Sequence, residues 1–383
     1  MRYSWLLVLV IALVVCLLFN MPSAPGKTMI EPFVQSTSRY KITYYAEIKG
    51  PSKNVSLILP LPPNNSEVKW IRMFTSTLNV LGVDSYDLRS YNNHFQNVLQ
   101  VNVVPPRRFL VEYEVEVYSG IFLNTSLRYS NVRSDLRVYE NLTKITYWWN
   151  YSINIIKKTI SFLKSKTLKR KDMTVAEVLS MIRNVTVSKL SYSPSGVRTH
   201  LSEALRRGTG DCSEYSDLYV TIARGLGIPA VRALGYIIEN WNEALGEYEY
   251  YGHAWPLVYI PGYGWIPVEV TIEDRGKYPL PGSNTLDYLC IFIDDSIEST
   301  ETWNPLNGSI LISPNEEWFL GFNEPLKINN YTITVDVKVY PSINYTITTA
   351  NVTANYFTYV VLLYSTLSLL IWILCCKVWR LKG

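Results

Sequence analysis

The chain has 383 residues, enough for two or three domains with a sizeable core. Its formal net charge of +4 is mild, and no dense basic patch with interleaved aromatic residues occurs, which excludes a nucleic-acid reader. Apolar residues make up 48% of the chain, raised by a long uncharged run near each end. No metal-ligand spacing and no phosphate-binding glycine loop occurs, so neither a metal nor another cofactor is expected.

The chain opens with Arg2, an apolar run over residues 5–19 and a Pro-, Ser- and Gly-containing stretch over residues 21–26. This order is typical of an export signal. The cleavage site is poor, because Ala24 is followed by proline and no clean pair of small residues precedes it. The sequence therefore predicts a signal anchor over residues 1–26, with a cleaved signal peptide as the alternative.

Strand-like runs follow the signal. Segments rich in Val, Ile, Leu and Tyr recur between clusters of Pro, Asn and Gly. The clearest are residues 40–48, 55–61, 98–104 and 109–117. We therefore expect an antiparallel, β-sandwich-like domain over residues 35–120.

An amphipathic, basic stretch comes next. One face is apolar, through Ile153, Ile156, Ile160 and Leu163. The lysine and arginine residues that lie among and after these positions, up to Lys171, have no acid among them. We interpret residues 121–173 as a solvated helical linker, and a helix on a membrane surface is the alternative.

Residues 174–275 are expected to form the central domain. Thr174, followed three residues later by Glu177, is a capping box that predicts the start of a helix. A second, short helix is expected over residues 201–207, and it should end at Gly208.

The most informative stretch is residues 208–215, which read Gly-Thr-Gly-Asp-Cys-Ser-Glu-Tyr. Apolar and aromatic residues then recur with helical spacing at Tyr215, Leu218, Tyr219, Ile222, Ala223 and Leu226. A glycine-rich turn thus delivers Cys212 to the amino terminus of a helix. The positive end of the helix dipole favours a thiolate there, and the Cys212 N–H is placed to bind an oxyanion. Tyr192, which precedes this turn, is a candidate cleft-lining residue or a plain surface aromatic.

A thiolate nucleophile needs a base, and the chain has three histidines: His94, His200 and His253. His94 lies in a polar turn of the first β domain, and His200 heads the short helix before Cys212. His253 begins an apolar strand, residues 253–260, which a Pro-Gly-Tyr-Gly turn connects to a returning strand. A histidine on a rigid hairpin facing a helix-borne cysteine suits covalent acyl chemistry. We therefore expect His253 to be the base.

The third member of such a site is a carboxylate that orients the imidazole, and Glu269 is the candidate. If the strands turn at residues 260–264, Tyr259 faces Trp265. Glu269 then lies on the same face as His253, whereas a slip of one residue would turn it to the other face. The sequence leaves this register open. The alternative acids are Glu273 and Asp274.

Two further strand-like runs, residues 287–293 and 331–339, predict a C-terminal β region over residues 276–352. An uncharged run follows that spans ~30 Å at ~1.5 Å per residue, about the thickness of a hydrocarbon core. We expect a transmembrane helix over residues 355–376. Because positive residues follow it directly, residues 377–383 should be a cytoplasmic tail and the catalytic domain extracytoplasmic, at the cell membrane.

The motif Asn-x-Ser/Thr, the acceptor for N-glycosylation, occurs ten times, always between the two apolar runs. Chance predicts about four occurrences for this composition. The excess favours a glycosylated outer segment over simple richness in Asn and Thr, and it fits an archaeal or eukaryotic host. The acceptors are Asn54, Asn64, Asn124, Asn141, Asn150, Asn184, Asn307, Asn330, Asn344 and Asn351.

Four short elements occur in order in the central domain. They are Gly-Asp-Cys at 210–212, Gly-Ile-Pro-Ala at 227–230, Gly-His-Ala-Trp at 252–255 and Pro-Gly-Tyr-Gly-Trp-Ile-Pro-Val-Glu at 261–269. Together they resemble the transglutaminase-like superfamily, over about residues 174–271. The resemblance implies an α+β fold with a papain-like core, flanked here by antiparallel β domains and terminal transmembrane helices, as in a membrane-anchored archaeal-type member.

The same resemblance implies a Cys-His-Asp triad. Position by position, Cys212 matches the nucleophile, His253 the base and Glu269 the acid. The chain departs from the family at the acid, where the usual Asp-Pro-Thr is Glu-Val-Thr. A carboxylate with one more methylene can still accept the imidazole N–H, but the geometry changes.

Two functions from different classes remain open. The first is a membrane-anchored cysteine enzyme that acts on peptide or amide bonds of a peptide or protein substrate, with hydrolysis favoured over cross-linking. The second is a catalytically weak or inactive binding or scaffold module at the cell surface. A disulfide between Cys212 and Cys290 would favour the second, because these are the two cysteines outside the apolar runs.

Overall fold

The computed structural model describes residues 33–91, 96–195, 197–272, 279–285, 287–295, 310–312, 325–328 and 330–342. The expected signal anchor, transmembrane helix and cytoplasmic tail lie outside the described residues, as do His94, Glu273 and Asp274. Within the described ranges, none of the helices has the length and apolar character needed to cross a membrane.

The first sheet has six strands, in the order β12-β6-β1-β16-β15, with β3 also paired to β6. In β6 buried and half-buried residues alternate, as expected of a strand with one face on a core. The long β1 pairs antiparallel with β6 on one side and with β16 on the other. The strands are β1 (Phe33–Lys49), β3 (Ile71–Leu81), β6 (Arg107–Ile121), β12 (Ser283–Asn284), β15 (Leu326–Ile328) and β16 (Tyr331–Pro341).

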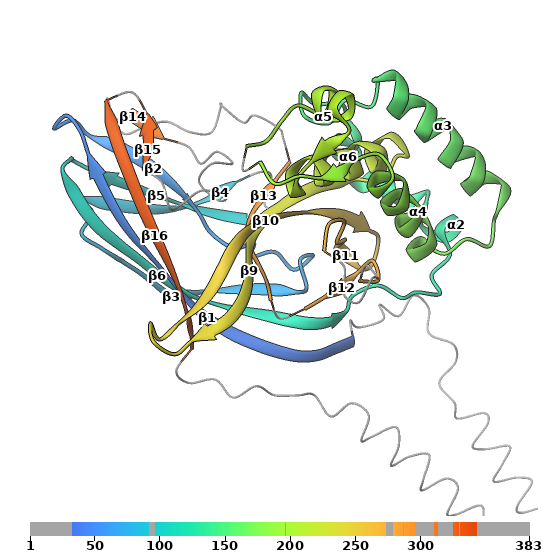
Figure 1. Ribbon diagram of the computed structural model, residues 1–383. Coiled ribbons are helices and arrows are strands. Elements are labelled where there is room, and N and C mark those ends of the chain that lie inside the picture. The colour runs from blue at the N-terminus through green and yellow to red at the C-terminus, as the bar shows by residue number, and fades with distance from the viewer. Residues whose placement is uncertain are drawn as a thin grey trace, which may run out of the picture. The chain divides into compact units, whose positions relative to one another are not determined.

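A second sheet has the order β14-β2-β5-β4. Its strands are β2 (Val55–Pro60), β4 (Ser85–Tyr91), β5 (Gln96–Val103) and β14 (Ile310–Ile312). We call the first and second sheets together the β region. Because β16 pairs with β1 and β14 pairs with β2, this region draws strands from both ends of the described chain (Figure 1).

The helices gather beside a third sheet of order β11-β10-β9-β13 (Figure 1). The strands are β9 (Ala230–Asn242), β10 (Glu247–Ile260), β11 (Gly264–Pro267) and β13 (Tyr288–Asp294), and a two-stranded sheet is formed by β7 (Ser191–Tyr192) and β8 (Thr209–Gly210). The helices are α2 (Tyr129–Val132), the 3₁₀ helix η2 (Asp135–Thr143), α3 (Asn154–Lys169), α4 (Val175–Val187), α5 (Leu201–Arg207) and α6 (Cys212–Gly225). The mixed α/β fold with largely antiparallel sheets agrees with the sequence analysis.

Residue patterns near the helix ends correctly predicted where α4 begins and where α5 ends. The capping box at Thr174 and Glu177 starts α4 as predicted, with both reciprocal hydrogen bonds present. α5 ends at Gly208, whose φ of 71° lies in the left-handed region that glycine adopts without strain. On α3, Ile156, Ile160 and Leu163 are buried as expected. Because protein covers this apolar face, the lysine-rich face of α3 is the exposed one.

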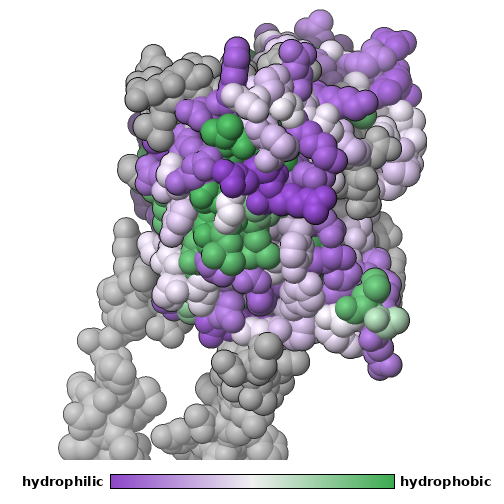
Figure 2. All heavy atoms as spheres, turned by 90° about the vertical axis from the view of Figure 1, so that its left-hand side faces the viewer, coloured by the Kyte–Doolittle hydropathy of each residue, from purple (hydrophilic) through white to green (hydrophobic). Residues whose placement is uncertain are grey.

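The third sheet contacts the β region through polar and aromatic side chains. The Trp70 indole N–H donates to the Trp265 carbonyl at 3.0 Å, and the Tyr250 hydroxyl donates to the Val337 carbonyl at 2.8 Å. Lys338 of β16 pairs with Glu247 of β10 at 2.9 Å. These contacts fix β10, which carries His253, against β16. The face seen in Figure 2 is mostly hydrophilic, with one larger apolar area near its centre and smaller apolar groups elsewhere on it.

Candidate active site

Cys212 is the first residue of α6, which confirms the prediction that it lies at a helix amino terminus. Asp211 caps the helix: its carboxylate accepts the Ser213 N–H at 2.9 Å and also the Glu214 N–H. Glu214 returns the bond by accepting the Asp211 N–H at 2.8 Å. Gly210 is needed in front of this cap, because a Cβ there would lie 2.6 Å from Cβ of Glu214. The turn therefore presents Cys212 in one orientation.

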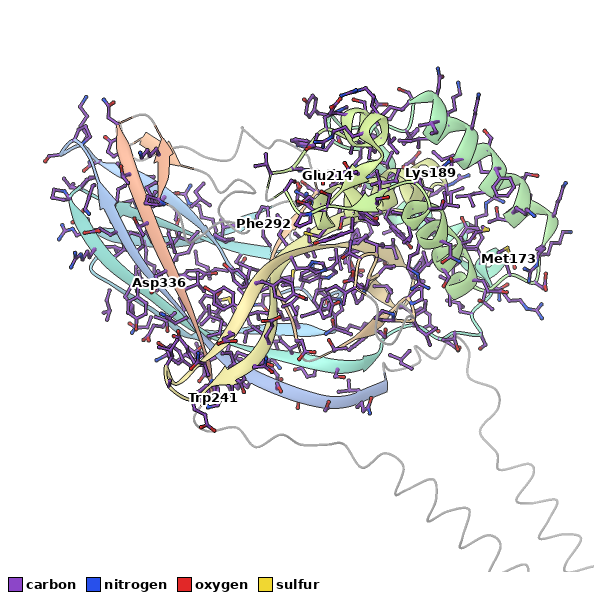
Figure 3. The ribbon with its side chains drawn as sticks, viewed as in Figure 1. Met173, Lys189, Glu214, Trp241, Phe292 and Asp336 are labelled. Atoms are coloured by element: carbon purple, nitrogen blue, oxygen red, sulfur yellow. The ribbon has the colours of Figure 1, made fainter. Side chains whose placement is uncertain are left out.

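The segment before α5 is held against the same end of α6. Asp211 Oδ2 accepts from the Ser195 hydroxyl at 2.9 Å, and Glu214 Oε1 accepts the Thr199 N–H at 2.5 Å. Glu214 is fully buried, and this burial raises its pKa to about 7, against the hydrogen bonds from Asp211 and Thr199. Figure 3 labels Glu214 among the side chains at the start of α6.

His253 lies on β10 with its ring 3% exposed. Its Nε2 is 3.0 Å from Oε2 of Glu269. The predicted turn is correct, because Tyr259 pairs with Trp265 and Ile260 with Gly264. However, β11 ends at Pro267, so Glu269 reaches the imidazole from the turn after the strand and not from the strand itself.

The Glu269 carboxylate is almost entirely surrounded by donors. Oε1 accepts the N–H groups of Val270, Thr271 and Ile272 at 2.8, 2.6 and 2.9 Å, and the Thr271 hydroxyl at 2.8 Å. Oε2 accepts from His253 and from the Tyr288 hydroxyl, the latter at 2.8 Å. Burial alone would raise the pKa of Glu269, but His253 and these backbone donors lower it to about 2. The extra methylene of Glu269 is accommodated by this turn.

The surroundings of the His253 imidazole favour its protonated form. Burial works to lower the pKa of His253, but the Glu269 charge and the hydrogen bonds with Cys212 and Glu269 raise it to about 10. Because Nε2 is engaged by Glu269, Nδ1 is the ring nitrogen left to meet Cys212. Both partners are nearly buried, Cys212 at 7% exposed and His253 at 3%. The structure thus places the imidazole in a hydrogen bond with the Glu269 carboxylate and within the influence of the Cys212 thiol.

Two aromatic residues pack against the His253 imidazole. Trp255 is stacked on His253, with ring centroids 5.8 Å apart and an interplanar angle of 18°. Tyr288 of β13 meets the same ring edge-on at 6.0 Å while its hydroxyl binds Glu269. Tyr288 is missing from the sequence-based site, because it belongs to a strand distant in sequence and no local motif marks it.

The remaining candidates lie apart from this chain of hydrogen bonds. His200 caps α5 and its ring bonds to the Ser202 hydroxyl and the Tyr147 carbonyl, which accounts for both nitrogens. The alternative interpretation, a disulfide between Cys212 and Cys290, is wrong, since both cysteines are free. Cys290 is buried in β13, where burial raises the pKa of its thiol far above the usual range. Among the described residues, no group of three or more His, Cys, Asp or Glu side chains could hold a metal ion.

Residues 162–270 match the model of a family described as the transglutaminase-like superfamily. Among solved structures, the chain is similar to a candidate cysteine protease from Cytophaga hutchinsonii, with 11% identity, coverage of 82% of this chain and 94% of that chain, and a TM-score of 0.49. It is also similar to the periplasmic domain of TgpA from Pseudomonas aeruginosa, with 15% identity, coverage of 64% and 94%, and a TM-score of 0.34. No curated protein has a matching sequence.

Proposed function

We propose that the transglutaminase-like domain which this chain carries over residues 162–270 is a cysteine hydrolase that acts on peptide or amide bonds. Cys212 is the nucleophile, His253 the acid and base, and Glu269 the carboxylate that orients and stabilises the imidazolium. The observation that carries the proposal is the 3.0 Å hydrogen bond between His253 and Glu269, in a buried site where Cys212 at the start of α6 acts on the same imidazole and raises its pKa.

The proposed reaction uses the Cys212 sulfur as the attacking group and the His253 imidazolium as the source of the proton. The Cys212 sulfur attacks the substrate carbonyl carbon, and the carbonyl electron pair moves to oxygen. Collapse of this intermediate breaks the C–N bond, and the His253 imidazolium gives its proton to the departing amine. The neutral imidazole then takes a proton from water as the water oxygen attacks the thioester carbon. Collapse of this second intermediate breaks the C–S bond, which releases the acid and restores the Cys212 thiolate beside the imidazolium. With an amine in place of water the same steps give a cross-link.

The proposal includes the cellular setting that the sequence predicts, an extracytoplasmic domain anchored in the membrane by residues 355–376. Glycosylation of the domain is part of it. The seven described acceptor asparagines are all at least partly exposed, as attachment of a glycan requires. They are Asn54, Asn64, Asn124, Asn141, Asn150, Asn184 and Asn330. Mass spectrometry of glycopeptides from the native host tests this, and unmodified peptides at all seven sites would argue against an outer location.

Reactivity of Cys212 is the first test of the enzyme. The full chain, purified in detergent micelles, is treated with iodoacetamide near neutral pH and its peptides are mapped. We expect selective alkylation at Cys212 that is lost in His253→Ala, because the imidazolium stabilises the thiolate. Cys290→Ala is the matched control, since it removes the other described thiol and leaves the site intact. Slow alkylation of Cys212 in the wild type would favour the binding module instead.

The reaction itself is tested with β-casein as the protein substrate, in H₂¹⁸O and with biotinylated cadaverine present. Hydrolysis places ¹⁸O in new carboxylates, whereas cross-linking places cadaverine on glutamine side chains. We expect ¹⁸O incorporation that disappears in Cys212→Ala. Cadaverine incorporation alone would make the protein a cross-linking enzyme, and neither label would leave the binding module as the function.

A further inference from the structure

Helix α3 has an exposed stripe of residues as well as a buried one. The buried stripe lies against α4 and α6, and Figure 1 shows α3 at the outer edge of the helices. Residues three or four positions apart lie on the same side of a helix. Five such residues on the side away from the core, all of them exposed, form what we call the exposed stripe: Ile155, Lys158, Phe162, Lys166 and Lys169.

Two side chains of the exposed stripe are apolar and open to solvent. Ile155 is 44% exposed and Phe162 is 55% exposed. The Lys166 ammonium lies 5.4 Å from the centre of the Phe162 ring, so a cation and an aromatic ring lie together in the middle of the stripe. Such a mixture suits a partner that is anionic at its surface and apolar beneath, because the lysine head stays with the anions while its stem and the ring enter the apolar layer.

The charged side chains of this part of the sequence are all positive. Residues 141–171 hold eight Lys and Arg residues and no Asp or Glu, whereas the whole chain has a net charge of +4, so the rest of the chain has a net charge of −4. Arg170 pairs with Asp172 and Glu177. Within the described ranges, however, the five lysines of α3 form no ion pair. Their charges are therefore available to an anionic partner.

The proposed membrane anchor holds the described part of the chain beside a bilayer. Twelve residues, 343–354, separate Ser342 from the expected transmembrane helix. An extended chain covers at most about 3.6 Å per residue, so this tether spans at most about 43 Å. Lipid headgroups are therefore the anions that a tethered domain meets at the highest effective concentration.

We propose that the exposed stripe of α3 binds the surface of an anionic lipid bilayer. Its lysines contact the headgroup phosphates, and Phe162 and Ile155 enter the boundary between the headgroups and the acyl chains. This role goes beyond the proposed chemistry and rests only on the membrane anchor that is part of the proposed function. Because α3 contacts α6, which begins at Cys212, binding of the stripe also fixes how far the nucleophile lies from the lipid.

Photocrosslinking of the full chain to lipid tests this contact. A p-benzoyl-phenylalanine replaces Phe162, and the chain is reconstituted in nanodiscs of phosphatidylcholine alone or of phosphatidylcholine mixed equally with phosphatidylglycerol. We expect at least about tenfold more protein–lipid adduct in the anionic discs, because each lysine at such a surface strengthens the binding. In about 1 M salt, where the Debye length is ~3 Å, the difference should disappear. The matched control carries the same amino acid in place of Tyr86, which is 50% exposed on β4.

A charge-reversed variant tests the part played by the lysines. It combines Lys158→Glu, Lys166→Glu and Lys169→Glu, which change the exposed stripe and leave the buried stripe of α3 intact. We expect the adduct in anionic discs to fall to the level in phosphatidylcholine discs. Alkylation of Cys212 by iodoacetamide, measured on the same samples, should keep its rate, which shows that the variant is folded.

The possible results are distinct. An adduct that needs both the anionic lipid and the lysines supports the proposal. Equal adduct in the two kinds of disc, adduct that survives charge reversal, or no adduct at all overturns it. If no adduct forms but heparin binds the wild type and not the charge-reversed variant, the partner is an anionic polysaccharide and the proposal is wrong. A chain that is retained in neither kind of disc refutes the proposed anchor and this proposal together. A Cys212 that does not react with iodoacetamide refutes the proposed enzyme alone, since the lipid adduct would still establish the role of α3.

Discussion

The β region and the helical region around α6 differ in where their charged side chains lie, at the surface in the first and buried in the second. In the β region, ion pairs lie on the outer faces of strands: Lys41 is 2.7 Å from Glu112, with side chains 38% and 24% exposed. All fourteen residues of α6 are buried, and they include charged ones. Figure 3 labels one residue of each kind, Asp336 on β16 and Glu214 on α6.

Asp217 shows the difference most clearly. It is fully buried on α6, and its carboxylate is 2.6 Å from the Arg198 guanidinium and accepts the Trp149 indole N–H at 2.7 Å. Arg198 and Arg232 each form a salt bridge with Asp294, at 3.2 and 2.9 Å. The network ties the segment before α5, the segment before α3 and two strands to the helix that carries Cys212.

The comparison shows that the contribution of an ion pair to the stability of the fold depends on how deeply the pair is buried, and not on how many such pairs there are. An exposed pair contributes about 0–1 kcal/mol, because water screens it and both side chains lose freedom. Removing one partner of a buried pair costs about 3–5 kcal/mol, because the other charge is left without compensation. The four expectations that follow test this contrast, from the largest effect to the smallest.

Glu269→Gln should have the largest effect, on the rate. The amide keeps the shape but loses the charge that stabilises the imidazolium and the acceptor that fixes its tautomer. We expect acylation by p-nitrophenyl acetate to slow by up to about 10⁴-fold. The same substitution at the half-buried Glu112 of the β region should leave the rate unchanged. Equal rates for Glu269→Gln and wild type would show that the carboxylate has no part in the chemistry.

Asp217→Ala should have the largest effect on stability. It leaves Arg198 and Arg232 buried with one partner fewer, so the free energy of unfolding should fall by about 3–5 kcal/mol. Asp336→Ala is the matched change in the β region, where the side chain is 59% exposed, and it should cost less than about 0.5 kcal/mol. Urea unfolding of the full chain in micelles measures both. Similar losses for the two variants would contradict the contrast.

The His253–Glu269 pair predicts a pH dependence. Glu269 has a pKa lowered from 4.5 to about 2, so its contribution to stability is present above 4.5 and is lost as pH falls toward 2. His253 has a pKa raised from 6.5 to about 10, so its contribution is present below 6.5 and is lost as pH rises toward 10. The difference in unfolding free energy between wild type and Glu269→Gln should therefore be largest between pH 4.5 and 6.5. A difference that does not vary with pH would rule out this coupling.

Thr174→Ala should have the smallest effect of the four. Thr174 belongs to the helical region but caps α4 at its exposed edge, where water can replace the lost hydrogen bond. We expect a loss of about 1 kcal/mol in unfolding free energy, with Thr174→Ser close to wild type because it keeps the hydroxyl. A loss as large as that of Asp217→Ala would mean that the region, and not burial, decides the size of the effect.

The sequence by itself determined the local parts of this protein. It predicted the capping box of α4, the position of Cys212 at a helix amino terminus and the turn between β10 and β11. Each of these follows from hydrogen bonds or backbone angles within a few residues, which residue types report directly. The transglutaminase-like domain that the sequence motifs predicted is confirmed by the family match over residues 162–270.

Only the tertiary structure decided which distant groups meet. In the tertiary structure Glu269 reaches His253 from beyond the end of β11, and Tyr288 binds the same carboxylate. Cys212 and Cys290 are both free, and β1 pairs with β16. Such contacts depend on strand order and on packing between segments far apart in the chain. No spacing within the sequence encodes them, because many pairings satisfy the same alternation of apolar and polar residues.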